Sequence, residues 1–151
     1  MLEIHHVNER KDLFDEAVKF FWRHWGSSDN YKFYRDCMVH AVENRNGLPR
    51  FYIAVIDNEI VGSYAMLRND LISRQDLFPW LACLYVVPPL RGKAYGAVIL
   101  SHAIRESKDF EHIYLCSELE NYYEKYGWEY TDDAYYLNGE QTKIYSIRTN
   151  R

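Results

Sequence analysis

The chain has 151 residues, 48% hydrophobic and 26% charged, which is enough for one domain with a single core. Its formal net charge of −4 argues against sequence-independent nucleic-acid binding, and no run approaches the roughly 18 apolar residues of a membrane span. The three cysteines lack any CxxC spacing and the first residues lack a basic, apolar leader, so we expect reduced thiols and a cytoplasmic location.

The N-terminal third predicts one strand and two helices. Residues 2–7 have strand character, and apolar residues then recur at helical spacing between Asp12, the expected cap, and Gly26, the expected stop. Polar residues 27–30 supply the next cap, and a second helical pattern ends before Pro49.

The rest of the chain is predicted to be mainly strands. Residues 80–87 are continuously apolar, as expected for a central strand buried on both faces. Turn chemistry at 57–59 and at Asn138-Gly139 predicts two antiparallel hairpins, the second with a two-residue loop. The segment 68–79 is polar and is expected to be a loop. The expected strands are 51–56, 60–67, 80–87, 112–116, 130–137 and 140–147, with helices at 96–107 and 121–126.

A basic turn containing glycine follows the central strand. The first turn of a helix has free N–H donors and a positive dipole end, so it suits a pyrophosphate. Gly92 and Gly96 allow close approach, while Arg91 and Lys93 add positive charge. A Walker A loop would need Ser or Thr after Gly-Lys, and a dinucleotide fingerprint needs three glycines. The alternative is an ordinary strand-to-helix loop in which the glycines only mark the boundary between the two elements. The segment is Arg91-Gly92-Lys93-Ala94-Tyr95-Gly96.

This turn resembles the acyl-CoA-binding signature of the GCN5-related N-acetyltransferase (GNAT) superfamily: Arg or Gln, two residues, Gly, one residue, then Gly or Ala. Ala94 replaces the central Gly of the pattern and is expected to keep a negative φ. The order of elements is also similar to GNAT topology over nearly the whole chain. The resemblance implies one α/β (α+β mixed) domain over residues 1–151: a mixed, mostly antiparallel sheet of about seven strands, flanked by about four helices and splayed between the fourth and fifth strands.

The resemblance also implies the cofactor and its contacts. Acetyl-CoA would lie in the splay, with its thioester and pantetheine against the central strand at Leu84, Tyr85 and Val86. Its pyrophosphate would lie on the turn described above, at Arg91, Gly92, Lys93, Ala94, Tyr95 and Gly96.

A second match is centred on Tyr123, which falls on the catalytic tyrosine position of the family's Tyr-Glu-Lys-x-Gly-Phe segment. Trp128 replaces the Phe, and the preceding loop is shorter than usual. A phenol with a pKa of about 10 can protonate the departing thiolate, so Tyr123 is the expected general acid. Aromatic packing on a short helix is the alternative. The segment is Tyr123-Glu124-Lys125-Tyr126-Gly127-Trp128.

The resemblance places the acceptor between the two N-terminal helices and the terminal hairpin. These segments carry aromatic residues, whose rings can hold a cationic amine: Trp22, Trp25, Tyr31, Tyr34, Tyr135 and Tyr136. We expect substrate contacts from Trp22, Tyr31 and Trp80, the last standing where some relatives carry a strand Glu. Core packing remains open for Trp22 and Tyr31 and is favoured for Trp25.

No general base is evident, because the central strand has no carboxylate. The candidates are loop carboxylates and helix histidines, for which solvated or packed side chains are the favoured interpretation: Asp70, Asp76, Glu118, Glu120, His24 and His40.

The expected function is therefore transfer of an acetyl group from acetyl-CoA to a primary amine of a small molecule or peptide, without a metal, nucleic acid or membrane. One alternative is a GNAT-like module that binds acyl-CoA without turnover. The other is an unrelated, aromatic-lined interaction domain. Exposed aromatic residues would be consistent with a homodimer.

Overall fold

The structure is a computed structural model that describes residues 1–150. It contains one seven-stranded sheet with the order β1-β2-β3-β4-β5-β7-β6, in which every neighbouring pair is antiparallel except β4 and β5. The strands are β1 (Glu3–His6), β2 (Arg50–Ile56), β3 (Glu59–Leu67), β4 (Trp80–Val86), β5 (His112–Ser117), β6 (Glu129–Tyr135) and β7 (Gln141–Arg148). The predicted fold class and number of strands are confirmed.

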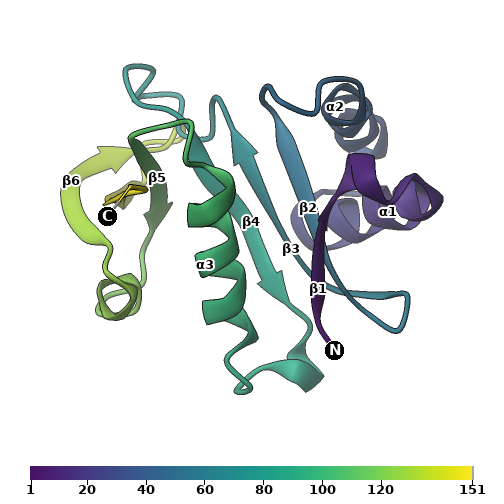
Figure 1. Cartoon of the computed structure of the whole chain (residues 1–151). Helices are drawn as coiled ribbons and strands as arrows, with labels where there is room; N and C mark the ends of the chain where they lie inside the picture. The colour runs from purple at the N-terminus through teal and green to yellow at the C-terminus, as the bar shows by residue number, and fades with distance from the viewer. Residues whose placement is uncertain (151) are drawn as a thin grey trace.

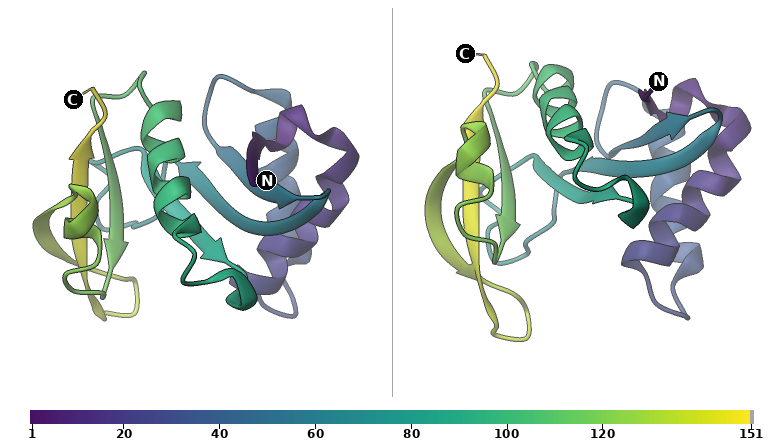
Figure 2. Two further views of the ribbon diagram at one scale, coloured as in Figure 1. Left: turned by 60° about the horizontal axis from the view of Figure 1, so that its bottom comes forward. Right: turned by 90° about the horizontal axis from the view of Figure 1, so that it is seen from below.

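Within residues 1–150, three α-helices cover the sheet (Figures 1 and 2). Helices α1 (Phe14–Trp25) and α2 (Tyr31–Glu43) lie on one face and α3 (Tyr95–Glu106) lies on the other. The predicted fourth helix at 121–126 is instead a 3₁₀ turn, Tyr123–Tyr126, because Gly127 adopts φ 93° and ends it after one turn.

Strand β2 shows how one segment serves both layers. Its alternate residues Tyr52 and Ala54 pack in the cluster that contains Leu100 of α3. Phe51 and Ile53 pack in the cluster that contains the buried residues of α1 and α2. Because side chains alternate between the faces of a strand, a run without polar residues is buried on both sides.

Two local predictions are wrong. Asp12 does not cap α1, since its carboxylate accepts hydrogen bonds from the Arg10 guanidinium at 2.9 and 3.0 Å and the N-cap position is Leu13. The β6–β7 hairpin has a three-residue loop, because the Tyr136 N–H donates to the Glu140 carbonyl and Gly139 takes φ 90°. A three-residue loop with a left-handed glycine is the next most common hairpin connection.

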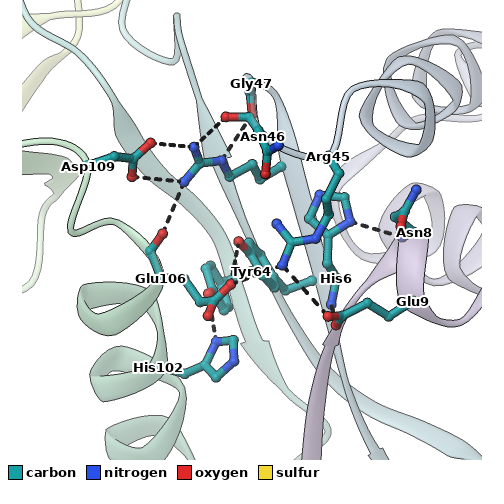
Figure 3. A network of polar contacts seen from close by, with 12 residues as sticks. His6, Asn8, Glu9, Arg45, Asn46, Gly47, Tyr64, His102, Glu106 and Asp109 are labelled. Atoms are coloured by element: carbon teal, nitrogen blue, oxygen red, sulfur yellow. Dashed lines mark hydrogen bonds and ion pairs between the residues drawn. The ribbon is translucent and has the colours of Figure 1, made fainter.

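A polar network closes the end of the sheet where β4 and β5 remain paired (Figure 3). Arg50, only 4% exposed, lies at its centre. Its guanidinium donates to the carbonyls of Asn46, Gly47 and Glu106 at 2.8 to 3.0 Å, and it pairs with Asp109 at 2.7 Å. These contacts tie the loop before β2 to the C-terminal end of α3.

His6 is completely buried at the end of β1. Its Nδ1 accepts a hydrogen bond from the Asn8 N–H at 2.9 Å, so the neutral ring carries its proton on Nε2, which has no hydrogen-bond partner within residues 1–150. Burial, together with the nearby charges of Arg45 and Arg50, lowers the pKa of His6 to about 4.

We therefore expect acid to destabilise the fold through His6. An unfolded imidazole titrates near 6.5, so its contribution is fully present above that pH and is lost as the pH falls toward 4. The free energy of unfolding should fall by about 2 kcal/mol from this group between about pH 7 and pH 5. Urea denaturation at both pH values measures the loss. His6→Asn, which keeps an acceptor for the Asn8 N–H, should show a smaller loss than wild type; an equal loss would exclude His6 as the source.

Candidate active site

The sheet opens between β4 and β5. These strands pair only at Trp80 and Tyr114, and the Tyr114 N–H donates to the Pro79 carbonyl at 3.1 Å. Beyond this point they diverge toward the first turn of α3 (Figure 1). The predicted splay between the fourth and fifth strands is confirmed.

Strand β4 also carries a bulge at the opening. Its register against β3 shifts between Ser63 and Ala65, and Cys83 adopts φ 55°. The Ser63 hydroxyl donates to the Cys83 carbonyl at 2.8 Å and so fixes the distorted backbone. A bulge interrupts pairing and redirects the backbone groups that follow it, here those of Leu84 and Tyr85.

A first cavity, the α3 pocket, has a volume of about 460 Å³ and lies between the end of β4, the first turn of α3 and the 3₁₀ turn at Tyr123. Eight of the nine residues expected to bind the cofactor line it, and Lys93 does not. Its lining is Leu84, Tyr85, Val86, Leu90, Arg91, Gly92, Ala94, Tyr95, Gly96, Ala97, Leu119, Tyr122, Tyr123 and Tyr126.

The turn before α3 leaves its backbone open. Gly92 has φ 83°, and a Cβ built there would have no heavy atom within 4 Å. Ala94 is the N-cap of α3 and provides no side-chain hydrogen bond, so the first N–H groups of the helix have no side-chain acceptor. Arg91 donates through Nε to the Val86 carbonyl at 2.8 Å, and its guanidinium lies 5.0 Å from the centre of the Tyr85 ring.

Ala94 does not have the negative φ expected for an alanine, because its φ is 64° in the left-handed region. A Cβ in this conformation approaches the following carbonyl oxygen, which glycine avoids. Ala94 therefore adopts, at a cost in strain, a conformation that glycine adopts more readily.

Ala94→Gly should raise the free energy of unfolding by about 1 kcal/mol, because it relieves this strain. Urea denaturation measures the change. Ala97→Gly, inside the first turn of the same helix, is the matched control and should lower stability by about 0.5 to 1 kcal/mol. If both variants lose stability equally, Ala94 is not strained.

A second cavity, the β5 pocket, has a volume of about 500 Å³ and lies on the other side of the splay. It shares Leu84, Leu119 and Tyr123 with the α3 pocket. Its lining is Trp25, Tyr34, Asp70, Leu81, Ala82, Cys83, Leu84, Leu115, Cys116, Ser117, Glu118, Leu119, Tyr123 and Tyr136.

Tyr123 is therefore at the junction of the two cavities. Its ring packs 5.9 Å from Tyr145 and 6.2 Å from Trp128, and its carbonyl accepts the Trp128 N–H at 3.2 Å. Burial, with a smaller effect from Tyr122, raises the pKa of Tyr123 to about 12. The phenol thus keeps its proton throughout the neutral range.

The β5 pocket contains two carboxylates that were expected to be solvated. Glu118 accepts hydrogen bonds from the hydroxyls of Thr142 at 2.9 Å and Tyr136 at 3.3 Å. The Asp70 carboxylate has the Cys116 thiol at 3.8 Å, and desolvation raises the pKa of this carboxyl. Sequence reasoning named both residues but could not place them on one cavity wall.

The aromatic wall differs from the expected one. Trp25 and Tyr34 line the β5 pocket, and the Tyr34 hydroxyl donates to the Trp25 carbonyl at 2.9 Å. Trp22 and Tyr31, from the same two helices, instead pack edge to face with ring centres 5.4 Å apart.

Trp80, from which we expected a substrate contact, lines neither the α3 pocket nor the β5 pocket. It is completely buried with Leu71 and Ile144, and its indole N–H donates to the Leu77 carbonyl at 2.8 Å. The first residue of β4 faces a core cluster there, and the wall of the β5 pocket begins at the next residue, Leu81.

Within residues 1–150, no group of three or more His, Cys, Asp or Glu residues is arranged to hold a metal ion. None of the helices in this part of the chain combines the length and apolar character that crossing a membrane requires.

The sequence matches the family model for the acetyltransferase (GNAT) family over residues 12–128. No curated protein matches it significantly. The fold is similar to an aminoglycoside 6′-N-acetyltransferase complexed with coenzyme A, at 16% identity, 99% and 98% coverage of the two chains and a TM-score of 0.72.

Two further solved structures are similar. One is a GNAT-family acetyltransferase from Streptococcus pneumoniae, with 15% identity, 98% and 99% coverage and a TM-score of 0.70. The other is a chimeric spermidine N-acetyltransferase from Vibrio cholerae, with 14% identity, 99% coverage of both chains and a TM-score of 0.70. At these identities the likeness establishes the fold.

Proposed function

The chain belongs to the GNAT acetyltransferase family, and on this premise we propose that it transfers an acetyl group from acetyl-CoA to a primary amine of a small molecule or peptide. One observation carries the proposal. Two cavities approach the splay from opposite sides and share Leu84, Leu119 and Tyr123, so a donor in one and an acceptor in the other would meet beside a half-buried phenol.

The α3 pocket fits the phosphates and pantetheine of coenzyme A. The uncapped first turn of α3 offers N–H donors, and the Gly92 position has no atom to block an approaching anion. Arg91 is held by the Val86 carbonyl through Nε, which leaves its terminal nitrogens available for a phosphate. The edge of β4 after the bulge would pair with the pantetheine amides.

Acetyl-CoA supplies a thioester whose carbonyl carbon accepts the amine nitrogen. As the C–N bond forms and the C–S bond breaks, Tyr123 donates its phenolic proton to the sulfur. Backbone N–H groups at Leu84 to Val86 would stabilise the oxyanion. The proton that the nitrogen loses restores the phenol through solvent, so Tyr123 ends each turnover neutral.

The β5 pocket would hold the acceptor. Asp70 and Glu118 supply negative charge, and Trp25, Tyr34 and Tyr136 supply rings that contact an amine. An amine must lose its ammonium proton before it attacks, and Asp70, whose pKa is raised, is the carboxylate better suited to receive that proton.

A thermal melt with excess acetyl-CoA tests the donor site. A ligand at 100 times its Kd adds about 2.7 kcal/mol of stability, so the midpoint should rise by roughly 2 to 8 °C. Gly96→Val should abolish most of the rise, because even a Cβ at this position comes within 3.3 Å of the Tyr122 hydroxyl at the pocket wall. No rise for wild type at millimolar acetyl-CoA would overturn the proposal.

Binding of acyl-CoA without turnover is the second candidate. The strained Ala94 in the phosphate turn and the lack of a carboxylate on β4 favour it. The release of free coenzyme A thiol in the presence of a panel of amines separates the two candidates. Release above the rate without amine supports the transferase, and a melt shift without release supports the binding module.

A further inference from the structure

A third cavity, the hairpin pocket, adjoins the β5 pocket. It has a volume of about 410 Å³ and lies between the segment 68–79 and the turn of the β6–β7 hairpin. The two pockets share Asp70 and Tyr136, so they form one continuous recess that leads away from Tyr123. The lining of the hairpin pocket is Asp70, Leu71, Ile72, Tyr136, Leu137, Asn138 and Glu140.

The charges of this recess are uncompensated. Among residues 1–150, no Lys, Arg or His lines either pocket, whereas Asp70, Glu118 and Glu140 all do. Glu140 accepts a hydrogen bond from the neutral Asn138 amide at 2.6 Å, and the Cys116 thiol is the hydrogen-bond partner of Asp70. By contrast, Asp76 pairs with Arg74 at 3.0 Å on the same loop.

The walls of the hairpin pocket are apolar on both sides. Ile72 is 61% exposed and Leu137 is 93% exposed, and they face the cavity from the loop and the hairpin. Leu71 forms part of the buried base. Covering such side chains favours a ligand with a hydrocarbon segment.

We propose that the hairpin pocket binds the second ammonium group of an elongated dicationic acceptor, whose first amine is acetylated at Tyr123. Glu140 neutralises the distal ammonium, and Ile72 and Leu137 cover the methylene spacer. The continuity of the two cavities sets the length requirement, because a short acceptor fills only the β5 pocket. This inference rests on the proposed function and adds the class of amine.

The test compares acetylation of diaminobutane, diaminooctane, butylamine and octylamine by full-length protein with saturating acetyl-CoA. We expect kcat/KM for diaminooctane to exceed that for octylamine by roughly tenfold, since the two differ only in the distal charge. Glu140→Gln keeps an acceptor for Asn138 and should raise KM for diaminooctane roughly fivefold without changing KM for butylamine. Leu137→Ser should lower affinity for both octyl compounds.

Glu129→Gln is the matched control, since it removes the same charge from an exposed position on β6 outside this recess. Equal kcat/KM for diaminooctane and octylamine would overturn the inference, as would equal effects of Glu140→Gln on short and long amines.

A second experiment applies if acetyl-CoA binds but no amine is turned over. Diaminooctane is then titrated calorimetrically into the acetyl-CoA complex. Binding that Glu140→Gln weakens supports the subsite, and no binding overturns it. Failure to bind acetyl-CoA counts against the proposed function itself.

Discussion

Tyr123→Phe is expected to lower kcat by about 100-fold or more while the Kd of acetyl-CoA stays nearly unchanged. The change removes only the hydroxyl, so the ring contacts with Trp128 and Tyr145 remain. The departing thiolate then has no proton donor at the junction of the two cavities. Single-turnover kinetics and calorimetric titration with acetyl-CoA measure the two quantities separately.

Tyr126→Phe is the control for that experiment. Tyr126 lines the α3 pocket but not the junction, so its loss should leave kcat within about twofold of wild type. Because burial raises the pKa of Tyr123 to about 12, the wild-type rate should also show no loss of its proton donor up to about pH 10. Equal kcat for Tyr123→Phe and wild type would remove Tyr123 from the mechanism.

Arg50→Met should lower the free energy of unfolding by about 3 to 5 kcal/mol. The substitution keeps much of the side-chain volume but leaves three carbonyls and Asp109 without their donor (Figure 3). The carbonyls of Asn46, Gly47 and Glu106 lose a charged donor, and Met offers no hydrogen bond in its place. Urea denaturation at neutral pH measures the change.

Two control variants distinguish the effect of burying the Arg50 guanidinium from the effect of its ion pair with Asp109. Arg10→Met breaks an exposed pair with Asp12 and should cost less than about 1 kcal/mol. Asp109→Asn should cost less than Arg50→Met, because the Asp109 side chain is 52% exposed and Arg50 keeps its three carbonyl acceptors. A loss of less than about 1 kcal/mol for Arg50→Met would show that the network contributes little to stability.

Sequence patterns alone were enough to predict the order of the strands, the three α-helices and the glycine-containing turn before α3. These features are local: hydrophobic periodicity, glycine positions and turn residues act within a few residues of chain. The continuously apolar run at 80–87 correctly predicted the central strand β4, but only Trp80 and Leu81 are buried and the residues from Ala82 to Val86 are half-buried where the sheet opens. The helix expected at 121–126 is only a 3₁₀ turn.

Local patterns failed where two conformations compete for one residue. Asp12 had the composition of a helix cap, but Arg10 offered its carboxylate a charged partner two residues away. Ala94 was expected to have a negative φ, as alanine prefers, but the turn into α3 requires a left-handed conformation at that position. In both cases the neighbouring structure outweighed a preference of about 1 kcal/mol.

Which side chains face the site depends on how distant elements pack against one another. Trp80 and Trp25 have the same side chain, yet the first packs in a core cluster where β4 and β5 are paired, and the second lies on a cavity wall at the end of α1. Asp70 and Glu140 are 70 positions apart in number and meet across one pocket because the loop after β3 and the β6–β7 hairpin lie side by side. Sequence periodicity shows which residues share one face of a helix or strand. Which other residues that face contacts depends on the pairing of elements that are far apart in the sequence.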